Sequence, residues 1–345
     1  MTPTLSTRVR FAAVAATIWK RRAIRLGLLA CVVLLLGPIA VASLFGRSWI
    51  AHGIAVAPNA GLTFRADDDV LSEHDRGLGI DEQLRVDVAS LGVTSSMSVW
   101  IVEPRAPARG TVLVLHGIRS DKTGVVGLAK QIAEEGYVSV LPDLPGHGRS
   151  SGDWLTYGVR EVGDLAALLD ELARRGRLKG QLGIVGFSYG AAVAIQLAAV
   201  DKRIRAVVAV APFSSLRRIV PSYVERYIPL LGKLVPASFI QQGVDQAGAL
   251  GHFDPDAASP LQAISRTPAQ ILLLHGRSDR HIPCINSIEL HAAAPDHSEL
   301  ILLEGEDHLS IAADRTHTIA TQGMHWLHRW LDDPATSPAT NPPAN

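Results

Sequence analysis

Residues 182–190 read Leu-Gly-Ile-Val-Gly-Phe-Ser-Tyr-Gly, and this stretch decides the fold of the 345-residue chain. It begins as a short apolar run typical of a buried strand, and an apolar helix-like run follows at 191–200. A G-x-S-x-G sequence at a strand-to-helix junction is typical of a nucleophile elbow, which lifts the serine hydroxyl above the sheet edge. We therefore expect Ser188 to be a nucleophile, with Gly186 and Gly190 shaping the turn. A chance Gly/Ser turn is the alternative, since the chain has 30 glycines.

Strand and helix patterns alternate on both sides of this junction. Apolar or alternating runs that predict strands occupy 83–89, 96–102, 111–115, 138–141, 182–187, 206–210, 271–274 and 300–303. Helical spacing occupies 125–135, 158–174 and 316–330. This alternation predicts an α/β fold, with a mostly parallel central sheet covered by helices on both faces.

One long insertion interrupts the alternation. Residues 212–264 intervene between two predicted strands, and their helical and Pro/Gly-rich composition predicts a short helical cap. Its apolar residues either form a pocket for a hydrophobic substrate or pack the cap onto the body. These residues are Val220, Tyr223, Tyr227, Ile228, Leu230, Leu231, Leu234 and Phe239.

Over about residues 83–332 the chain resembles the α/β-hydrolase superfamily. In that family the catalytic residues follow strands in the order Ser, then Asp or Glu, then His. The resemblance implies that Ser188 is the nucleophile, that Asp279 after the strand at 271–274 is the acid, and that His308 after the last strand is the base. Haloalkane- and epoxide-type relatives are disfavoured, because they use Asp where this chain has Ser188.

The turn after the strand at 111–115 resembles the oxyanion-hole turn of the same family. Its residues His116 and Gly117 are expected to shape the site. The donors implied by the resemblance are the backbone amides of Ile118 and Tyr189. His116 precedes the serine in the chain, so the order of the triad argues against a role as the base.

A second loop, residues 143–150, also matches a loop that recurs in this superfamily. Asp143 is an alternative acid, and His147 is expected to be a loop residue. Elsewhere, His281 is expected at the surface or at the site rim. His325 and His328 have helical i, i+3 spacing, but no third metal ligand is evident. The sequence contains neither a G-x-G-x-x-G fingerprint nor a Walker A loop, so it implies no cofactor and no metal.

The N-terminal region has a different character from the rest of the chain. Residues 1–25 carry only basic charges, and the run at 26–46 contains no charged residue. This uncharged run is long enough to cross a bilayer. The positive-inside bias predicts a single-pass anchor with a cytoplasmic N-terminus and an extracytoplasmic body, periplasmic in a bacterium. A signal peptide cleaved near Ala42 is the alternative, which would give a secreted protein. We expect a connector at 47–80, a hydrolase domain at 81–332 and a disordered tail at 333–345.

Composition limits the classes of function. The 33 basic and 33 acidic residues balance, so no bulk positive charge favours nucleic-acid binding. The two cysteines, Cys31 and Cys284, form no disulfide framework. Together the motifs predict a serine hydrolase that cleaves a carboxylic ester or related acyl bond of a small or lipid-like substrate through an acyl-enzyme. A peptidase or amidase of the same fold, and a catalytically silent binding module, are the alternatives.

Overall fold

The computed structural model describes residues 19, 21, 22, 25–27, 46–62, 72–90, 93–228, 232–314 and 317–332. The predicted tail at 333–345 lies outside these residues, as do nearly all of the predicted basic segment and most of the predicted anchor at 26–46. Within the described ranges, no helix combines the length and the apolar character that a membrane span requires. The chain divides into two units, Met1–Trp49 and Ile50–Asn345. The second unit holds the sheet and the candidate site.

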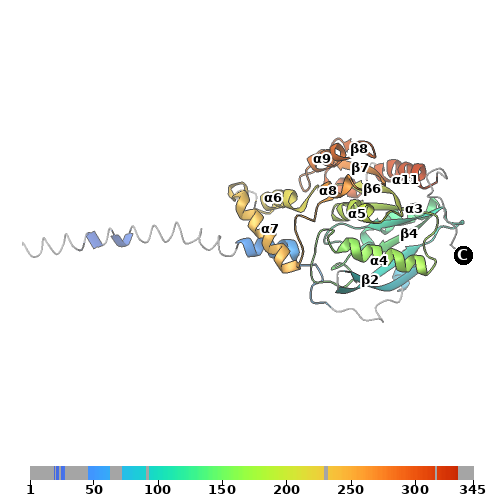
Figure 1. The fold of residues 1–345 in the computed structure, drawn as a ribbon, viewed down its shortest axis with the longest axis horizontal. Helices are drawn as coiled ribbons and strands as arrows, with labels where there is room; N and C mark the ends of the chain where they lie inside the picture. Colours follow the sequence, from blue (N-terminus) through green and yellow to red (C-terminus); the bar gives the residue numbers. More distant parts are fainter. Residues whose placement is uncertain are drawn as a thin grey trace, which may run out of the picture. The chain divides into compact units, whose positions relative to one another are not determined.

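An eight-stranded sheet forms the centre of the second unit (Figure 1). Its strands are β1 (Glu82–Ser90), β2 (Val93–Val102), β3 (Gly110–Leu115), β4 (Tyr137–Pro142), β5 (Gln181–Phe187), β6 (Ile204–Val210), β7 (Gln270–Gly276) and β8 (Ser298–Leu303). The order across the sheet is β1-β2-β4-β3-β5-β6-β7-β8. All pairs from β4 to β8 are parallel, and β1 and β2 pair antiparallel at one edge. The predicted mostly parallel sheet is confirmed.

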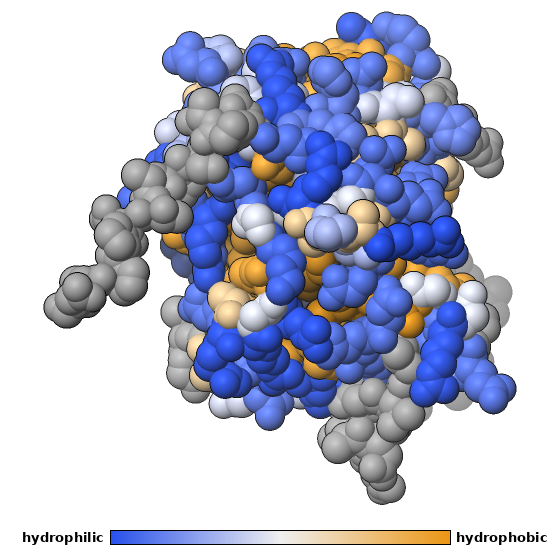
Figure 2. Space-filling model, turned by 90° about the vertical axis from the view of Figure 1, so that its right-hand side faces the viewer, coloured by the Kyte–Doolittle hydropathy of each residue, from blue (hydrophilic) through white to orange (hydrophobic). Residues whose placement is uncertain are grey.

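Helices cover both faces of the sheet. One face carries α4 (Glu161–Arg174), α5 (Tyr189–Val200), α8 (Pro260–Ile264) and α9 (Ile285–Ala293), whose apolar residues share one core. The other carries α3 (Val126–Glu134), α10 (His308–Ala312) and α11 (Met324–Leu331), which share the second core. Figure 2 shows the face of the molecule turned away from α6 and α7, where hydrophilic residues predominate and hydrophobic residues lie between them near the centre.

Burial on both faces explains why the strands read as continuous apolar runs. Every residue of β3 and β4 is buried. The helix α5 has no polar face, because it packs against β5, β6, α4 and α8. The helix α4 is amphipathic instead, and its buried leucines follow the i, i+3, i+4, i+7 spacing of one helical face. These are Leu165, Leu168, Leu169 and Leu172.

The insertion between β6 and β7 contains α6 (Leu216–Tyr227), the short helix η3 (Gly232–Leu234) and α7 (Ala237–Gly251). Figure 1 shows α6 and α7 together at one end of the body. Arg217 joins them, because its guanidinium contacts Asp245 of α7 at 2.8 Å and Asp256 at 2.5 Å. Of the predicted apolar cap residues, Val220 is buried, whereas Tyr227 and Leu234 are exposed.

The region predicted as a connector at 47–80 is more ordered than expected. Residues 50–55 are helical, and the following residues pair with 153–155, since the amide of Leu155 donates to Ala55 O at 2.8 Å. Apolar residues at the spacing of one helical face are buried in the core beside α5. These are Ile50, Ala51, Ile54 and Ala55. Residues 50–62 therefore belong to the body, and only α2 (Glu73–Gly77) is regular in the described part of 72–80.

Two predicted helices begin later than their apolar spacing suggested. The run at 158–174 becomes helical only at Glu161, because the buried Glu161 carboxylate accepts hydrogen bonds from the amides of Thr156 and Gly158 and holds these residues in a turn. The run at 316–330 begins with the π-helical η4 (Ile319–Gly323), which leads directly into α11.

Candidate active site

Ser188 stands at the junction of β5 and α5, as its motif predicted. Its φ of 52° and ψ of −111° lie outside the ordinary regions for a residue with a side chain. Its amide donates to Val210 O at 2.7 Å, which fixes the turn against β6. The strained conformation lifts the side chain from the carboxyl end of β5 toward the edge where β7 and β8 also end.

The two motif glycines are needed for close packing rather than for positive φ. A Cβ at Gly186 would stand 2.5 Å from the carbonyl oxygen of Gly190. A Cβ at Gly190 would stand 2.5 Å from the carbonyl oxygen of His116. Real Cβ atoms do not approach backbone this closely, so both positions exclude every larger side chain without a shift of the chain.

His308 lies beside the serine. Its Nε2 is 3.1 Å from Ser188 Oγ, and its Nδ1 is 2.7 Å from Asp279 Oδ2. Asp307 fixes the start of the helix that carries His308, because its carboxylate accepts hydrogen bonds from the amides of Leu309 and Ser310. These bonds hold the pKa of Asp307 below its usual range, so the carboxylate remains an ionised helix cap.

The carboxylate of Asp279 is completely buried behind His308. Its Oδ1 accepts from the amides of His281 and Ile282, and His275 lies 3.4 Å from its Oδ2. Burial alone would raise the pKa of Asp279, but the hydrogen bonds from His275 and His308 outweigh it and hold the pKa well below its usual range. A permanent anion therefore orients the imidazole.

The predicted oxyanion turn packs directly beside the serine. A Cβ at Gly117 would be 3.7 Å from Ser188 Cβ. Among the described residues, the backbone amides of Ile118 and Tyr189 have no hydrogen-bond acceptor. Two unpaired N–H groups next to a serine hydroxyl are the arrangement that stabilises a developing oxyanion.

His116 and His147 form hydrogen bonds with backbone groups of the loops around the site and are not positioned to act as bases. His116 Nε2 accepts from the Leu144 amide at 2.9 Å, so its Nδ1 carries the proton and donates to Gly117 O at 2.8 Å. Burial lowers the pKa of His116 and lowers that of His147 to about 3, with the neighbouring His116 adding to the second shift. The two rings are 5.1 Å apart, and both are neutral at physiological pH.

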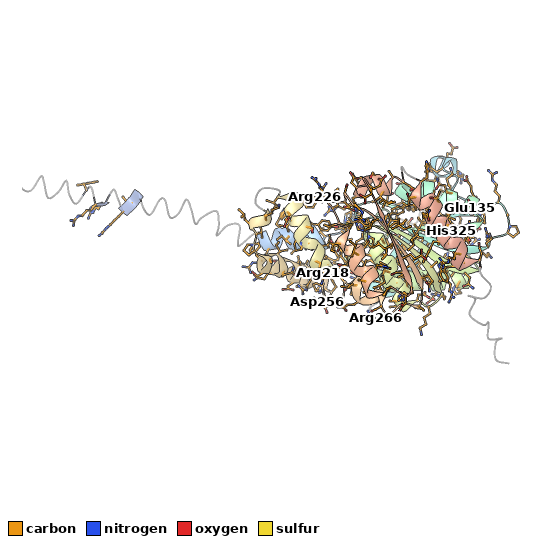
Figure 3. All side chains as sticks on the ribbon, turned by 90° about the horizontal axis from the view of Figure 1, so that it is seen from above. Glu135, Arg218, Arg226, Asp256, Arg266 and His325 are labelled. Atoms are coloured by element: carbon orange, nitrogen blue, oxygen red, sulfur yellow. The ribbon has the colours of Figure 1, made fainter. Side chains whose placement is uncertain are left out.

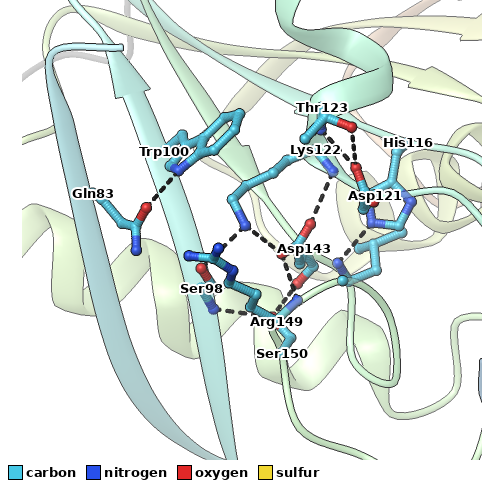
Figure 4. A network of polar contacts seen from close by, with 12 residues as sticks. Gln83, Ser98, Trp100, His116, Asp121, Lys122, Thr123, Asp143, Arg149 and Ser150 are labelled. Carbon is cyan, nitrogen blue, oxygen red and sulfur yellow. Dashed lines mark hydrogen bonds and ion pairs between the residues drawn. The ribbon is translucent and has the colours of Figure 1, made fainter. Parts of the chain in front are cut away.

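Two buried carboxylates near the site carry contacts that sequence reasoning missed. Glu161 accepts from the Tyr189 hydroxyl at 2.6 Å, which anchors the side chain of the residue after the serine. Asp143, predicted as an alternative acid, is paired with Lys122 and has no contact with His308 (Figure 4). Neither pairing has a local sequence signal, because the partners are 28 and 21 residues apart.

The other histidines that the sequence analysis named lie in different parts of the molecule. His281 lies at the rim of the site, with its ring centroid 5.1 Å from that of His308. Figure 3 shows His325 and Glu135 at one end of the body, whereas Arg218 and Arg226 of the cap helix α6 lie toward the other end. In the part of the chain that the structure describes, no group of three His, Cys, Asp or Glu side chains could hold a metal ion.

Two residues of the cap helix α6 interact electrostatically with residues of the same site. Burial raises the pKa of Tyr223 well above its usual range, and the nearby Tyr227 and Asp279 add to the shift. Burial also lowers the pKa of His281, and the positive charge of Arg226 lowers it further. Tyr223 and Arg226 therefore lie within electrostatic range of the residues around His308.

Comparison with known proteins agrees with the fold. Residues 112–322, more than half of the chain, match the Alpha/beta hydrolase family, and the chain belongs to that family. It is 23% identical over 226 residues to YqkD of Bacillus subtilis (strain 168), covering 64% of this chain and 72% of YqkD. It is 24% identical over 224 residues to YfhR of Escherichia coli (strain K12), covering 64% and 70%.

A solved structure extends the likeness to most of the body. The esterase Pf2001 of Pyrococcus furiosus superposes with a TM-score of 0.61 at 21% identity, covering 80% of this chain and 98% of the esterase. At that identity the likeness concerns the fold. Fold and family together support hydrolase activity.

Proposed function

We propose that the protein is a serine hydrolase that cleaves a carboxylic ester or a related acyl bond. The observation that carries the proposal is the continuous chain of contacts from Ser188 Oγ to His308 Nε2, at 3.1 Å, and from His308 Nδ1 to Asp279 Oδ2, at 2.7 Å. A nucleophile, a base and an orienting acid within hydrogen-bond reach form a unit suited to nucleophilic catalysis.

The proposed reaction has two stages. His308 takes the proton from the Ser188 hydroxyl while the oxygen attacks the carbonyl carbon, and then gives that proton to the leaving group. Water attacks the resulting acyl-serine with His308 again as the base, which releases the acid and restores the serine. Asp279 holds the imidazole with its Nδ1–H directed at the carboxylate and stabilises the imidazolium.

The amides of Ile118 and Tyr189 are the proposed donors to the tetrahedral oxyanion. Donors of this kind are each worth about 3–4 kcal/mol of transition-state stabilisation. Because the donors are backbone groups, the Tyr189 side chain can bind Glu161 without affecting the donor role of its own amide.

The proposed substrate is a small or lipid-like ester with an apolar acyl group. Tyr223, Ile228 and Phe239 of the cap pack against the core but stay only partly buried, which leaves apolar surface for an acyl group. The fold likeness to an esterase points in the same direction. A peptidase or amidase activity is the alternative, and comparison of an ester with the matching anilide separates the two.

A fluorophosphonate probe tests the proposal on the full chain in detergent. The wild type is expected to be labelled, and Ser188→Ala is expected to lose all labelling. Ser310→Ala is a matched control, because Ser310 is near His308 in sequence but binds Asp307 rather than the imidazole. Absence of labelling in folded wild-type protein would contradict the proposal and favour a catalytically silent binding module.

We also propose that residues 26–46 anchor the protein in a membrane, with the N-terminus in the cytoplasm and the body on the other side. The support is the uncharged run between Arg25 and Arg47 and the six basic residues that precede it. Alkaline carbonate extraction of cell membranes tests the anchor. Retention of the full-length chain supports it, whereas a soluble chain that begins after Ala42 supports a cleaved signal peptide.

A further inference from the structure

The loop after β3 carries the Ile118 amide and is attached on both sides of it. Arg119, next to Ile118, has a φ of 58°, which is an uncommon conformation for a residue with a side chain. Before Ile118, Gly117 O accepts a 3.3 Å bond from the Ser120 amide and a 2.8 Å bond from the His116 ring. After Ile118, the loop is attached where it enters η2 (Lys122–Val125).

Lys122 attaches the loop through both its main chain and its side chain (Figure 4). Its amide donates to Asp143 Oδ1 at 2.8 Å, and its ammonium donates to Asp143 Oδ2. The ammonium also donates to Ser98 Oγ at 3.1 Å and lies 4.9 Å from the centre of the Trp100 ring. The Lys122 and Asp143 side chains are 4% and 0% exposed, so water hardly reaches the pair.

Asp143 is itself fixed in place at the carboxyl end of β4. The Arg149 amide donates to its Oδ2 at 2.8 Å, and Ser150 Oγ donates to its carbonyl at 2.7 Å. A Cβ at Gly148 would stand 2.3 Å from the Asp143 carboxyl carbon, so the loop at 143–150 closes tightly around the carboxylate. The carboxylate is therefore a rigid point to which Lys122 can be attached.

Stability alone does not explain a buried ion pair at this place. Removing two charges from water is costly, and apolar residues of similar volume often stabilise a fold as well or better. What the pair supplies is position, because one carboxylate holds both the backbone and the side chain of Lys122, four residues after Ile118. The catalytic value of an oxyanion donor depends on its placement within a few tenths of an ångström.

We propose that Lys122 is a positioning residue, which acts through Asp143 to hold the Ile118 amide where the oxyanion forms. This inference rests on the proposed serine-hydrolase function. Lys122 touches neither substrate nor Ser188 in this account, so its loss should lower kcat while leaving substrate binding nearly unchanged.

The test compares Lys122→Met, Lys122→Met/Asp143→Asn and Tyr137→Phe in the full chain, with a p-nitrophenyl ester as substrate. Tyr137→Phe is the matched control, because its hydroxyl binds Asp332 at 2.7 Å at the opposite end of β4. For Lys122→Met we expect kcat to fall about 10–100-fold with KM changed by less than about threefold. Affinity for a trifluoromethyl ketone, which forms an oxyanion adduct, should fall by the same factor as kcat.

The double variant separates position from stability. Removing both charges relieves the unpaired buried carboxylate, so the melting temperature should recover relative to Lys122→Met while kcat stays low. A kcat within about twofold of wild type in either variant, or a kcat that recovers together with the melting temperature, overturns the inference. If Lys122→Met does not fold, the double variant alone decides by the same criterion.

The outcome is independent of the test of the proposed function. Wild-type protein that neither hydrolyses esters nor reacts with a fluorophosphonate refutes the hydrolase proposal itself. Wild-type protein that is active and a Lys122→Met variant with unchanged kcat refute only the positioning role.

Discussion

Gly190 packs directly against the carbonyl of His116, and this contact joins the nucleophile turn to the oxyanion turn. A Cβ at residue 190 would stand 2.5 Å from His116 O and 2.7 Å from Leu115 O. For Gly190→Ala we therefore expect the free energy of unfolding to fall by about 1–3 kcal/mol, because two backbone segments must move apart. Urea unfolding measures this loss, and ester hydrolysis should fall with it.

Gly127→Ala is the matched control for that substitution. Gly127 lies inside α3, and nothing stands within 4 Å of its potential Cβ. The alanine should stabilise the protein by about 0.5–1 kcal/mol, since it lowers the entropy of the unfolded chain without a clash. Equal destabilisation by both substitutions would show that the His116 contact is not the cause.

Asp279→Asn should reduce kcat by about four orders of magnitude with little change in KM, because an amide no longer enforces the required tautomer of His308. Steady-state kinetics on a model ester measure both constants. Asp143→Asn is the comparison, since Asp143 is bound to Lys122 and not to His308. A larger loss from Asp143→Asn than from Asp279→Asn would make Asp143 the acid.

The stability that Asp279 contributes to the fold should be lost in acid. Its hydrogen bonds with His308 and His275 outweigh burial and hold its folded pKa below the ordinary value of 3.8. The unfolded chain therefore binds the proton first, and the stabilisation is complete above about pH 4 and is lost as the pH falls through the lower folded pKa. Wild type and Asp279→Asn should accordingly converge in stability in acid, as followed by denaturant unfolding.

His147 should make the fold sensitive to mild acid. Burial lowers its folded pKa to about 3 from the ordinary 6.5, so the unfolded state binds a proton between these values and the folded state does not. Stability is thus retained above about pH 6.5 and falls by up to about 1.4 kcal/mol per pH unit below it. His147→Asn, which keeps a donor toward Pro145 O, should reduce this slope by one proton. An unchanged slope would mean that His147 is protonated in the folded protein.

Arg217 should control how firmly α7 is held against α6 within the cap. Its guanidinium contacts Asp245, Asp256 and Gln241, at 2.8, 2.5 and 3.2 Å. Arg217→Met should speed amide hydrogen exchange in α7 while leaving β5 and β6 unchanged, with a global cost of about 1 kcal/mol or less because the contacts are partly exposed. Arg218→Met, which removes one ion pair to Glu289 of α9, should leave exchange in α7 unchanged.

The sequence predicted the sheet and the approximate places of its helices because both leave periodic signals. The β3 and β5 runs are mostly apolar, since helices cover both faces, and α4 repeats its leucines at helical spacing. The helix at residues 50–55 was not predicted, because only four small or β-branched residues of it face the core. The whole stretch was therefore interpreted as part of a connector. The helix α4 begins later than predicted because Glu161 accepts hydrogen bonds from the Thr156 hydroxyl and the Gly158 amide. Hydrophobic periodicity does not reveal such bonds.

The candidate site was predictable where motifs follow strands and unpredictable where distant loops meet. Ser188, Asp279 and His308 each follow a strand of one parallel sheet, so the fold alone brings them to the same edge. The partners Lys122–Asp143 and Tyr189–Glu161 meet only after the loops close, and a charge or a hydroxyl at either position has no local signature. The strained backbone conformation of Ser188 could not be read from composition either, because the turn between β5 and α5 imposes it.

The acyl-enzyme is the most direct test of the account. Full-length protein is mixed with p-nitrophenyl acetate, quenched in acid within the burst of p-nitrophenol and digested with trypsin for mass spectrometry. We expect one added acetyl group, located on Ser188, that is absent from Ser188→Ala. Hydrolysis that continues at the wild-type rate in Ser188→Ala, or an acetyl group carried only by another residue, would contradict it.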